Sequence, residues 1–441
     1  MKLYSDYFHN NINDFIQKIP KQFDKKPYLL NELYKKQTEI VIDYIKKRNL
    51  KIYGGVAIDK HLPEGEKIYD ESNDTQIIDF DIYTPTPRSD AVELGNLLFN
   101  AGFEYVNVQE GVNKGVYKVF NYFQEVTDFV FVPYKIYNMI PTNKINDVLY
   151  VDPKHLKIDL LVSLTNPKYS NYRWTKDNER LLLLEKNNPI DKPRNFLQNN
   201  YYKKNTYYLE KIIKKFINQQ INNYVVIGNL AYTAYMEESN IRDYYKPVIK
   251  YIEIGMKNPI NAINELKNIC KNNISVRKYH QFLKHIPPRY IITPKGQDNT
   301  ILLIIYDLSQ KSIPYVISNG EKIQSFHSLC LFYYFMIYLS GCYNINFQKE
   351  SSRCCLYELN RARKYYFSQN KTNQYKNNLF RDFITDFVGE ELDVYKQSKI
   401  NAFNRVKKFI YTPGKRQYLV ESSKVGAGIT KFISGEFDKE I

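Results

Sequence analysis

The stretch Ile77-Ile78-Asp79-Phe80-Asp81-Ile82-Tyr83 decides the fold of this chain. Its apolar and aromatic residues are typical of a buried β-strand, in which residues two apart project from the same face. Asp79 and Asp81 are therefore expected to lie side by side. Like charges at that separation repel each other, and burial makes their ionisation costlier still. The pair makes physical sense if divalent cations neutralise it, so the sequence predicts a metal site.

Outward from this strand, the hydrophobic periodicity predicts a lobe of helices and strands. A strand at 51–53 leads through Gly54 and Gly55 into a helix at 56–62. The other predicted helices cover residues 28–48, 89–100, 153–164 and 171–186, and two hairpin-like strands cover 115–122 and 125–134. The Gly54-Gly55 turn precedes a helix N-terminus, where bare backbone amides and the helix dipole suit a triphosphate.

A third carboxylate, Asp128, lies inside the apolar strand predicted at 125–134. Three acidic groups on adjacent strands can hold two Mg²⁺ (or Mn²⁺) ions roughly 3.5–4 Å apart, the arrangement for in-line phosphoryl displacement. In this interpretation Asp79 and Asp81 each bind metal. Asp128 binds the catalytic metal and accepts the proton of an attacking hydroxyl. Singly, these features are also typical of a tight turn, a solvated strand edge and a structural aspartate; their order favours the metal site.

The chain then repeats this order of elements. A helix at 207–221 and a strand at 224–227 lead through Gly228-Asn229 into a helix at 230–238. Further strands are expected at 248–254, 300–306 and 313–317, with a helix at 261–272. Recurrence in a fixed order is typical of duplication. Tyr251 and Glu253 fall at the places of Asp79 and Asp81, and the strand at 313–317 has no carboxylate, so the second lobe is expected to be inactive.

This order of elements resembles the nucleotidyltransferase superfamily with a polymerase-β-like core. From about residue 29 to 186 it is most similar to the viral poly(A) polymerase catalytic subunits of poxviruses and giant viruses. The stretches VDPKHLKIDLLVSLTNP (151–167) and YRWTKDNER (172–180) belong to this resemblance. The resemblance implies that Gly54, Gly55, Asp79, Asp81 and Asp128 bind nucleotide and metal. Cellular members usually carry Gly-Ser in place of Gly54-Gly55, so one hydroxyl contact to the triphosphate is absent here.

The predicted fold class is α/β (α+β), with two nucleotidyltransferase-like lobes. The catalytic lobe is expected at residues 1–187, including an N-terminal helical extension. A linker rich in Pro, Asn and Lys follows at 188–205. A degenerate lobe with a helical C-terminal part is expected at 206–441. The acidic loop at 63–76 has no role that the sequence assigns.

Several basic residues are further candidates for contacts with phosphates. Lys157, Arg173 and Lys176 could neutralise the triphosphate, although a solvated face of an amphipathic helix explains them equally well. Clusters of basic residues beside aromatic residues are typical of single-strand binding, and each cluster alone is also typical of ordinary surface. The RNA-binding candidates are Lys203, Lys204, Arg361, Arg363 and Lys364. Trp174 is interpreted as an anchor in the core.

Composition favours an intracellular protein that binds a polyanion. Lys and Arg (63) exceed Asp and Glu (47), a net charge of +16, which indicates nucleic acid before membrane, although AT-rich codons also favour lysine. Five cysteines without paired spacing, and no signal peptide, indicate a reducing compartment. The longest apolar run, LCLFYYFMIYLSGC, is shorter than the ~20 residues that span a bilayer. We expect no membrane contact.

The activity that the resemblance implies is template-independent addition of AMP from ATP to mRNA 3′ ends, with release of pyrophosphate. Another terminal RNA nucleotidyltransferase, of uridylyl or CCA type, and a non-catalytic RNA-binding scaffold remain alternatives. The expected partners are an RNA 3′ end and either a second copy of the chain or a methyltransferase-like processivity subunit, with self-association preferred. The implied location is the host-cell cytoplasm and the virion.

Overall fold

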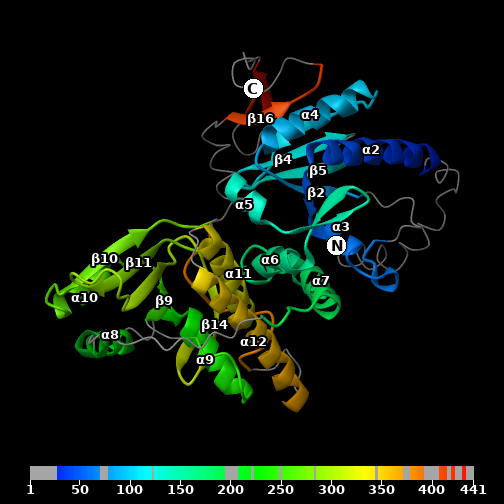
Figure 1. The fold of residues 1–441 in the computed structure, drawn as a ribbon. Coiled ribbons are helices and arrows are strands. Elements are labelled where there is room, and N and C mark those ends of the chain that lie inside the picture. The colour runs from blue at the N-terminus through cyan, green and yellow to red at the C-terminus, as the bar shows by residue number, and fades with distance from the viewer. Residues whose placement is uncertain are drawn as a thin grey trace, which may run out of the picture. The chain divides into compact units, whose positions relative to one another are not determined.

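A computed structural model describes twelve ranges of the chain. These are residues 27–69, 78–121, 124–193, 207–219, 223–247, 251–282, 285–342, 346–370, 378–391, 407–414, 419–422 and 430–433. They form a mixed α/β fold, as predicted, with two sheets (Figure 1). The chain divides into two compact units. The first comprises Met1–Phe131, Thr142–Tyr150 and Arg405–Ile441, and the second comprises Val132–Pro141 and Val151–Asn404.

The first unit is built on a ten-stranded sheet with the order β18-β17-β16-β3-β4-β5-β2-β1-β7-β6. The aspartate-bearing strand β2 lies inside this sheet, antiparallel to β1 and parallel to β5. The strands of its central part are β1 (Lys51–Tyr53), β2 (Phe80–Thr84), β3 (Asn107–Glu110), β4 (Val116–Asn121) and β5 (Gln124–Phe131).

Three α-helices accompany these strands, all at places that the sequence predicted: α2 (Pro27–Arg48), α3 (Gly54–Lys60) and α4 (Pro87–Asn100). A short 3₁₀ helix, η2 (Glu64–Glu66), follows α3. Asp90 on α4 is fully buried and accepts hydrogen bonds from Tyr44 Oη (3.1 Å), Arg48 Nη2 (2.9 Å) and Thr84 Oγ1. Because these donors come from α2 and from the end of β2, Asp90 fixes both helices against the aspartate strand.

Six strands of this sheet were not foreseen, β3 among them. β6 (Thr142–Ile145) and β7 (Val148–Val151) extend one side, where β7 runs parallel to β1. β16 (Lys407–Tyr411), β17 (Leu419–Ser422) and β18 (Thr430–Ile433) extend the other, where β16 pairs with β3. The division into units therefore differs from the expected boundaries. The C-terminal strands return to the first unit instead of completing the second.

The second unit also takes in helices that lie within residues 1–187, which the sequence had assigned to the catalytic lobe. These are α5 (Tyr134–Met139), α6 (Pro153–Leu164), η3 (Asn171–Arg173) and α7 (Trp174–Asn187). The first of them, α5, was not predicted. Residues 194–205 of the expected linker and residues 70–76 of the acidic loop lie outside the described residues.

The second unit is built on an eight-stranded sheet with the order β10-β11-β12-β9-β8-β14-β13-β15. Its strands are β8 (Tyr224–Val226), β9 (Ile252–Met256), β10 (Ile274–Tyr279), β11 (Arg289–Pro294), β12 (Leu303–Asp307), β13 (Ile313–Ser318), β14 (Glu321–Gln324) and β15 (Phe387–Val388). Its further helices are α8 (Tyr207–Gln219), α9 (Gly228–Ser239), α10 (Ile260–Ile269), α11 (Phe326–Cys342) and α12 (Asn346–Asn370).

Helix α11 contains the longest apolar run of the sequence, and it packs against α6, α9 and α12. Most of its side chains are buried, as predicted for a core helix. No helix in the described ranges is long and apolar enough to cross a membrane. All five cysteines are free thiols.

The two sheets share one strand order over seven strands. The order β3-β4-β5-β2-β1-β7-β6 of the first sheet is matched by β10-β11-β12-β9-β8-β14-β13 of the second. In both, the strand before the glycine turn is antiparallel to the next strand of its sheet and parallel to the strand on its other side (β7 or β14). The counterpart of β5 is therefore β12. The sequence predicted the counterpart of β5 at 313–317. That prediction was wrong because β11 was not recognised as a strand from the sequence.

Candidate active site

Gly54 lies at the junction of β1 and α3, and both its conformation and its surroundings require glycine. Its φ of +68° lies in the left-handed region. A Cβ atom at this position would fall 2.0 Å from Asp81 Oδ2. The backbone of the glycine turn therefore lies directly against one of the two predicted carboxylates. Gly55 is buried within the first turn of α3.

Asp81 lies within β2, as the sequence predicted, whereas Asp79, which was predicted to share that strand, lies outside it. Asp81 is half-buried in the strand and pairs in register with Tyr53 of β1 and Asp128 of β5. Asp79 precedes the strand and is exposed. Paired residues of neighbouring strands point to the same face, so Asp81 and Asp128 lie side by side on one face of the sheet.

Asp128 is held by a lysine that the sequence analysis did not single out. Lys118 Nζ on β4 lies 2.7 Å from Asp128 Oδ2 and 2.5 Å from Glu125 Oε1. Within the described residues, the buried Asp128 Oδ1 has no hydrogen-bond partner. Burial raises the pKa of Asp128 to about 8, with a further contribution from Glu125, although Lys118 opposes the shift. The sequence signal for Lys118 is its place as a lone basic residue in a strand of mostly apolar and aromatic residues, next to the strand that contains Asp128.

The donor chemistry of this face fits a divalent cation. Asp81 and Asp128 supply hard carboxylate oxygens at paired positions, and the orphaned Oδ1 of Asp128 lacks a positive partner that a cation would provide. The described residues nevertheless contain no group of three His, Cys, Asp or Glu side chains already gathered closely enough to hold a metal. The structure therefore presents the adjacent carboxylates of Asp81 and Asp128, with Asp79 just before the strand.

The corresponding place in the second unit is closed by protein. Gly228 has a φ of +64°, and a Cβ there would fall 2.1 Å from Glu253 Oε2. Glu253 is buried and accepts hydrogen bonds from Tyr306 Oη (3.1 Å) and from the backbone N–H of Asn229 (3.4 Å). Its register partner on β12 is Ile304, where the first unit has Asp128. One carboxylate thus remains of the paired arrangement, and its oxygens bond to protein groups.

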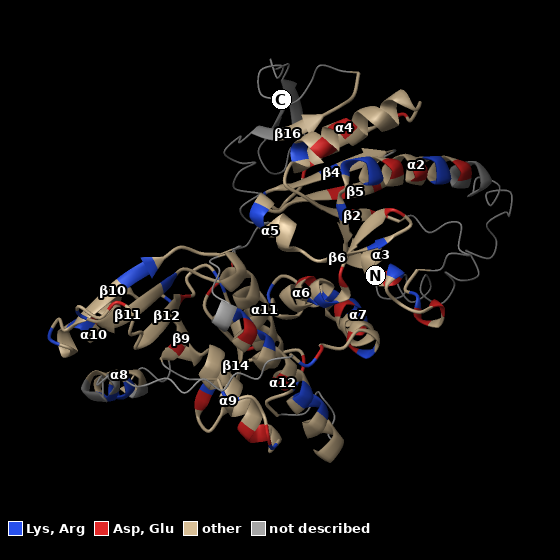
Figure 2. Ribbon diagram, viewed as in Figure 1, with Lys and Arg blue, Asp and Glu red and all other residues tan. Residues whose placement is uncertain are grey.

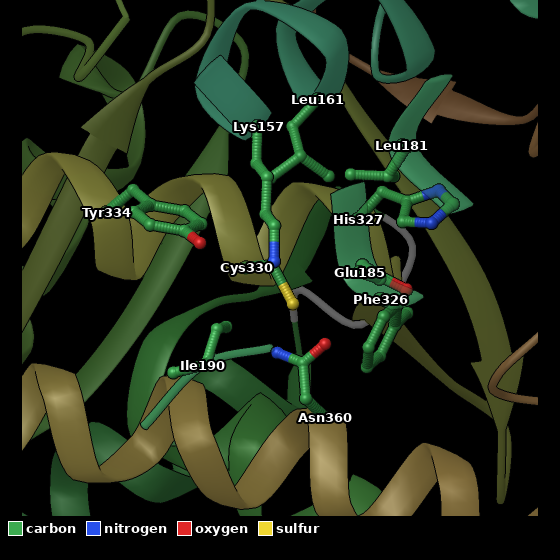
Figure 3. A pocket seen from close by; sticks show the side chains of 10 residues that line it. All are labelled: Lys157, Leu161, Leu181, Glu185, Ile190, Phe326, His327, Cys330, Tyr334 and Asn360. Carbon is green, nitrogen blue, oxygen red and sulfur yellow. The ribbon is translucent and has the colours of Figure 1, made fainter. Parts of the chain in front are cut away.

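Lys157, a predicted nucleotide contact, lies in the interior of the second unit. Its side chain enters a small cavity of about 10 Å³ beside Cys330 and Asn360 (Figure 3). Its Nζ donates to the carbonyl of Asn188 (2.8 Å), and only 2% of the residue is exposed. Burial lowers the pKa of Lys157 to about 8. Within the ranges that the structure describes, this ammonium is enclosed by protein, which favours a packing role for Lys157 over contact with a triphosphate.

The other basic candidates fall into three groups. Arg173, whose Nε lies 3.1 Å from Asp177 Oδ2, and Lys176 are exposed residues of the second unit. Lys203 and Lys204 lie outside the described residues. The cluster on α12 is split: Lys364 is exposed, Arg361 is half-buried beside Glu358, and Arg363 is buried. Arg363 Nη2 donates to both carboxylate oxygens of Asp382 (2.7 and 2.8 Å), which removes Arg363 from the RNA-binding candidates.

Comparisons with known proteins point to viral poly(A) polymerases. A family model for the poly(A) polymerase catalytic subunit matches residues 39–170. The chain is 24% identical over 438 residues to a putative poly(A) polymerase catalytic subunit of Acanthamoeba polyphaga mimivirus, covering 86% of this chain and 73% of the relative. It is 32% identical over 159 residues to the protein of the same description from African swine fever virus (strain Badajoz 1971 Vero-adapted), covering 34% and 33%.

The fold matches a solved structure over most of its length. The crystal structure of the Megavirus polyadenylate synthase superposes with a TM-score of 0.77 at 20% identity, covering 91% of this chain and 85% of that one. At this identity the match concerns the fold.

Proposed function

Because this chain is a relative of the viral poly(A) polymerase catalytic subunits, which are enzymes, we propose that it adds AMP from ATP to the 3′ end of RNA. The observation that carries the proposal is the register pair of Asp81 and Asp128 beside the Gly54 turn. This is the place where the sequence predicted nucleotide and metal to meet.

The residues of the first unit have distinct roles in the proposed reaction. Asp79, Asp81 and Asp128 would hold the divalent ions, which when bound supply positive charge to the triphosphate and to the attacking 3′-hydroxyl. Gly54 and Gly55 offer backbone to the triphosphate without a side chain in the way. Asp128 Oδ1, buried and without a described partner, is the atom proposed to accept the proton of the 3′-hydroxyl as pyrophosphate leaves.

Lys118 acts through Asp128 in this proposal. Its ion pairs with Glu125 and Asp128 fix the direction in which the Asp128 carboxylate points. A carboxylate held from one side by a lysine keeps its other oxygen free to face the reacting groups. Lys118 is thus a positioning residue.

We further propose that the two units arose by duplication and that the second lost its chemistry. The shared order of seven strands and the Gly228–Glu253 contact support this origin. The description of the relatives as catalytic subunits supports a partner subunit, while self-association stays a prediction from the sequence. Their viral sources support the host-cell cytoplasm as the location.

The decisive experiment is primer extension with Mg²⁺, an oligo(A) primer and each nucleoside triphosphate separately. Extension with ATP alone is the expected result. Asp81→Asn and Asp128→Asn should each reduce extension by at least about a thousandfold, as expected when a group bearing on the reacting atoms is lost, while primer binding persists. Asp147→Asn, which removes an exposed carboxylate on the β6–β7 turn, serves as the matched control.

The alternatives predict other outcomes of the same experiment. Preference for UTP would identify a uridylyltransferase, and addition limited to CCA would identify a tRNA-type enzyme. No extension with any triphosphate would refute the enzymatic proposal and leave the RNA-binding scaffold.

A further inference from the structure

The outer edge of the second sheet is strongly basic. From Lys271 to Asp298 the sequence contains six Lys and Arg residues and a single acidic residue, Asp298. The antiparallel strands β10 and β11 run through this segment, and Figure 2 shows basic residues on β10. Such a concentration of one charge favours a polyanionic partner.

Strand β10 is also an open edge. It stands at the end of the strand order, so in the part of the chain that the structure describes its outer side pairs with no strand. Its counterpart in the first sheet, β3, is covered there by β16. Charged side chains guard open edges against unwanted pairing, and Arg277 and Lys278 serve that purpose on β10. Guarding an edge does not require an exposed aromatic ring, however.

Tyr279 supplies such a ring. It pairs in register with Arg289 of β11, and the Arg289 guanidinium lies 5.3 Å from the centre of the Tyr279 ring. Despite this contact, 40% of Tyr279 is exposed. A cation over one face orients an aromatic ring, and the exposed surface is then available for stacking.

The neighbouring cations lie where a nucleic acid backbone could use them. Arg277 is two residues before Tyr279 and so projects from the same face. Its ion pair with Asp298 joins two half-exposed side chains, and such pairs contribute little stability. A phosphate can therefore replace Asp298 at low cost. Lys278 projects from the opposite face, with its ammonium 5.6 Å from the ring of the buried Tyr290.

We propose that Arg277, Tyr279 and Arg289, which share one face of the sheet, form a binding surface for single-stranded RNA, with one base stacked on Tyr279 and phosphates at the arginines. Exposed aromatic rings among basic side chains are the means by which proteins bind single strands without sequence preference. The choice of RNA rests on the proposed function. The surface gives the lobe that lacks the paired carboxylates a role in holding substrate.

The test is the affinity for a 30-nucleotide single-stranded RNA, measured by fluorescence anisotropy. Tyr279→Ala should weaken binding by about five- to a hundredfold, the range found when a stacking ring is removed. Tyr279→Phe keeps the ring and should bind like the wild type. Arg289→Ala should lower the slope of log affinity against log salt by about 0.7 for the phosphate contact it loses.

A matched control exists in the same unit. Lys322 lies 5.2 Å from the ring of the half-buried Tyr315 on the β13–β14 hairpin, a second cation–aromatic pair in this unit. Tyr315→Ala should leave RNA affinity unchanged. Equal losses of RNA affinity in Tyr315→Ala and Tyr279→Ala would overturn the proposal. Wild-type affinity in Tyr279→Ala, or a loss of affinity in Tyr279→Phe, would also overturn it. So would duplex RNA or polyglutamate that competes as well as single-stranded RNA.

Primer extension separates this proposal from the proposed function. Wild-type protein that binds RNA through Tyr279 and extends no primer would reject the activity and retain the surface. Wild-type protein that extends primers, with Tyr279→Ala binding equally well, would retain the activity and reject the surface.

Discussion

Replacing the buried Glu253 by glutamine should stabilise the second unit, and the gain should depend on pH. Glu253 is enclosed beneath the Gly228 turn, and burial raises its pKa from 4.5 to about 7 although Tyr306 and the Asn229 amide lower it in part. The folded protein therefore prefers the protonated acid. Glutamine resembles that neutral form in shape and hydrogen bonding, and it has no charge to bury.

The magnitude follows from the two pKa values. Between pH 4.5 and pH 7 the folded state binds more protons than the unfolded state, so stability falls as the pH rises through this window. A shift from 4.5 to about 7 costs the wild type about 2.5 kcal/mol between pH 5 and pH 8. Glu253→Gln should be spared this loss. Its advantage over the wild type should therefore be larger by about 2.5 kcal/mol at pH 8 than at pH 5.

The single tryptophan makes the measurement specific to the second unit. Trp174 on α7 donates to the carbonyl of Ser163 (3.1 Å) and stacks on Phe383, so its emission should report the unfolding of that unit. Denaturant titrations at pH 5 and pH 8 would compare the wild type with Glu253→Gln and with Glu238→Gln, an exposed control on α9. The same difference in stability at both pH values would refute the reasoning.

Three further results are expected. Gly54→Ala places a Cβ against Asp81 and strains the backbone, so it should lower kcat at least about tenfold. Gly228→Ala strains the backbone equally, but it should lower stability by about 1–3 kcal/mol and leave kcat unchanged. Equal losses of kcat in the two variants would contradict this expectation. Asp90→Ala should lower the unfolding free energy of the first unit by about 3 kcal/mol in denaturant titrations followed by hydrogen exchange, because it orphans buried donors, and a loss under about 1 kcal/mol would argue against it. Lys157→Met should leave KM for ATP within about twofold of the wild type, since the ammonium is interior, and a large rise would restore a role in binding nucleotide.

Part of the proposed catalytic face could be predicted because its signals are local. The place of Asp81 within a strand follows from the apolar residues on both sides of it, although Asp79, predicted to share that strand, precedes it. Gly54 marks a turn that needs a left-handed residue. The pairing of Asp81 with Asp128 followed only from assuming that their strands are neighbours, which the register confirms. Lys118 was missed because its pairing with Asp128 depends on the register of the β4–β5 hairpin, which the sequence does not give.

The elements that escaped prediction depend on contacts far apart in the sequence. β16 pairs with β3, and no local pattern links residues 407–411 to 107–110. Lys157 was predicted to be at the surface because lysine usually is. Helix α6 is instead buried on nearly all sides, and the Lys157 ammonium donates to the backbone carbonyl of Asn188. Arg363 likewise belongs to a basic cluster in the sequence but to an ion pair with Asp382 in the fold.

The return of the C-terminal strands to the first sheet has a consequence for synthesis on the ribosome. Residues 107–110 emerge about 300 residues before the strand that covers them, an interval of about 15–60 s at 5–20 residues per second. The second unit is complete within residues 132–404, so it can fold before its neighbour is finished. We therefore expect the lobe bearing the aspartates to mature last, with β3 as an uncovered edge on the nascent chain in the meantime.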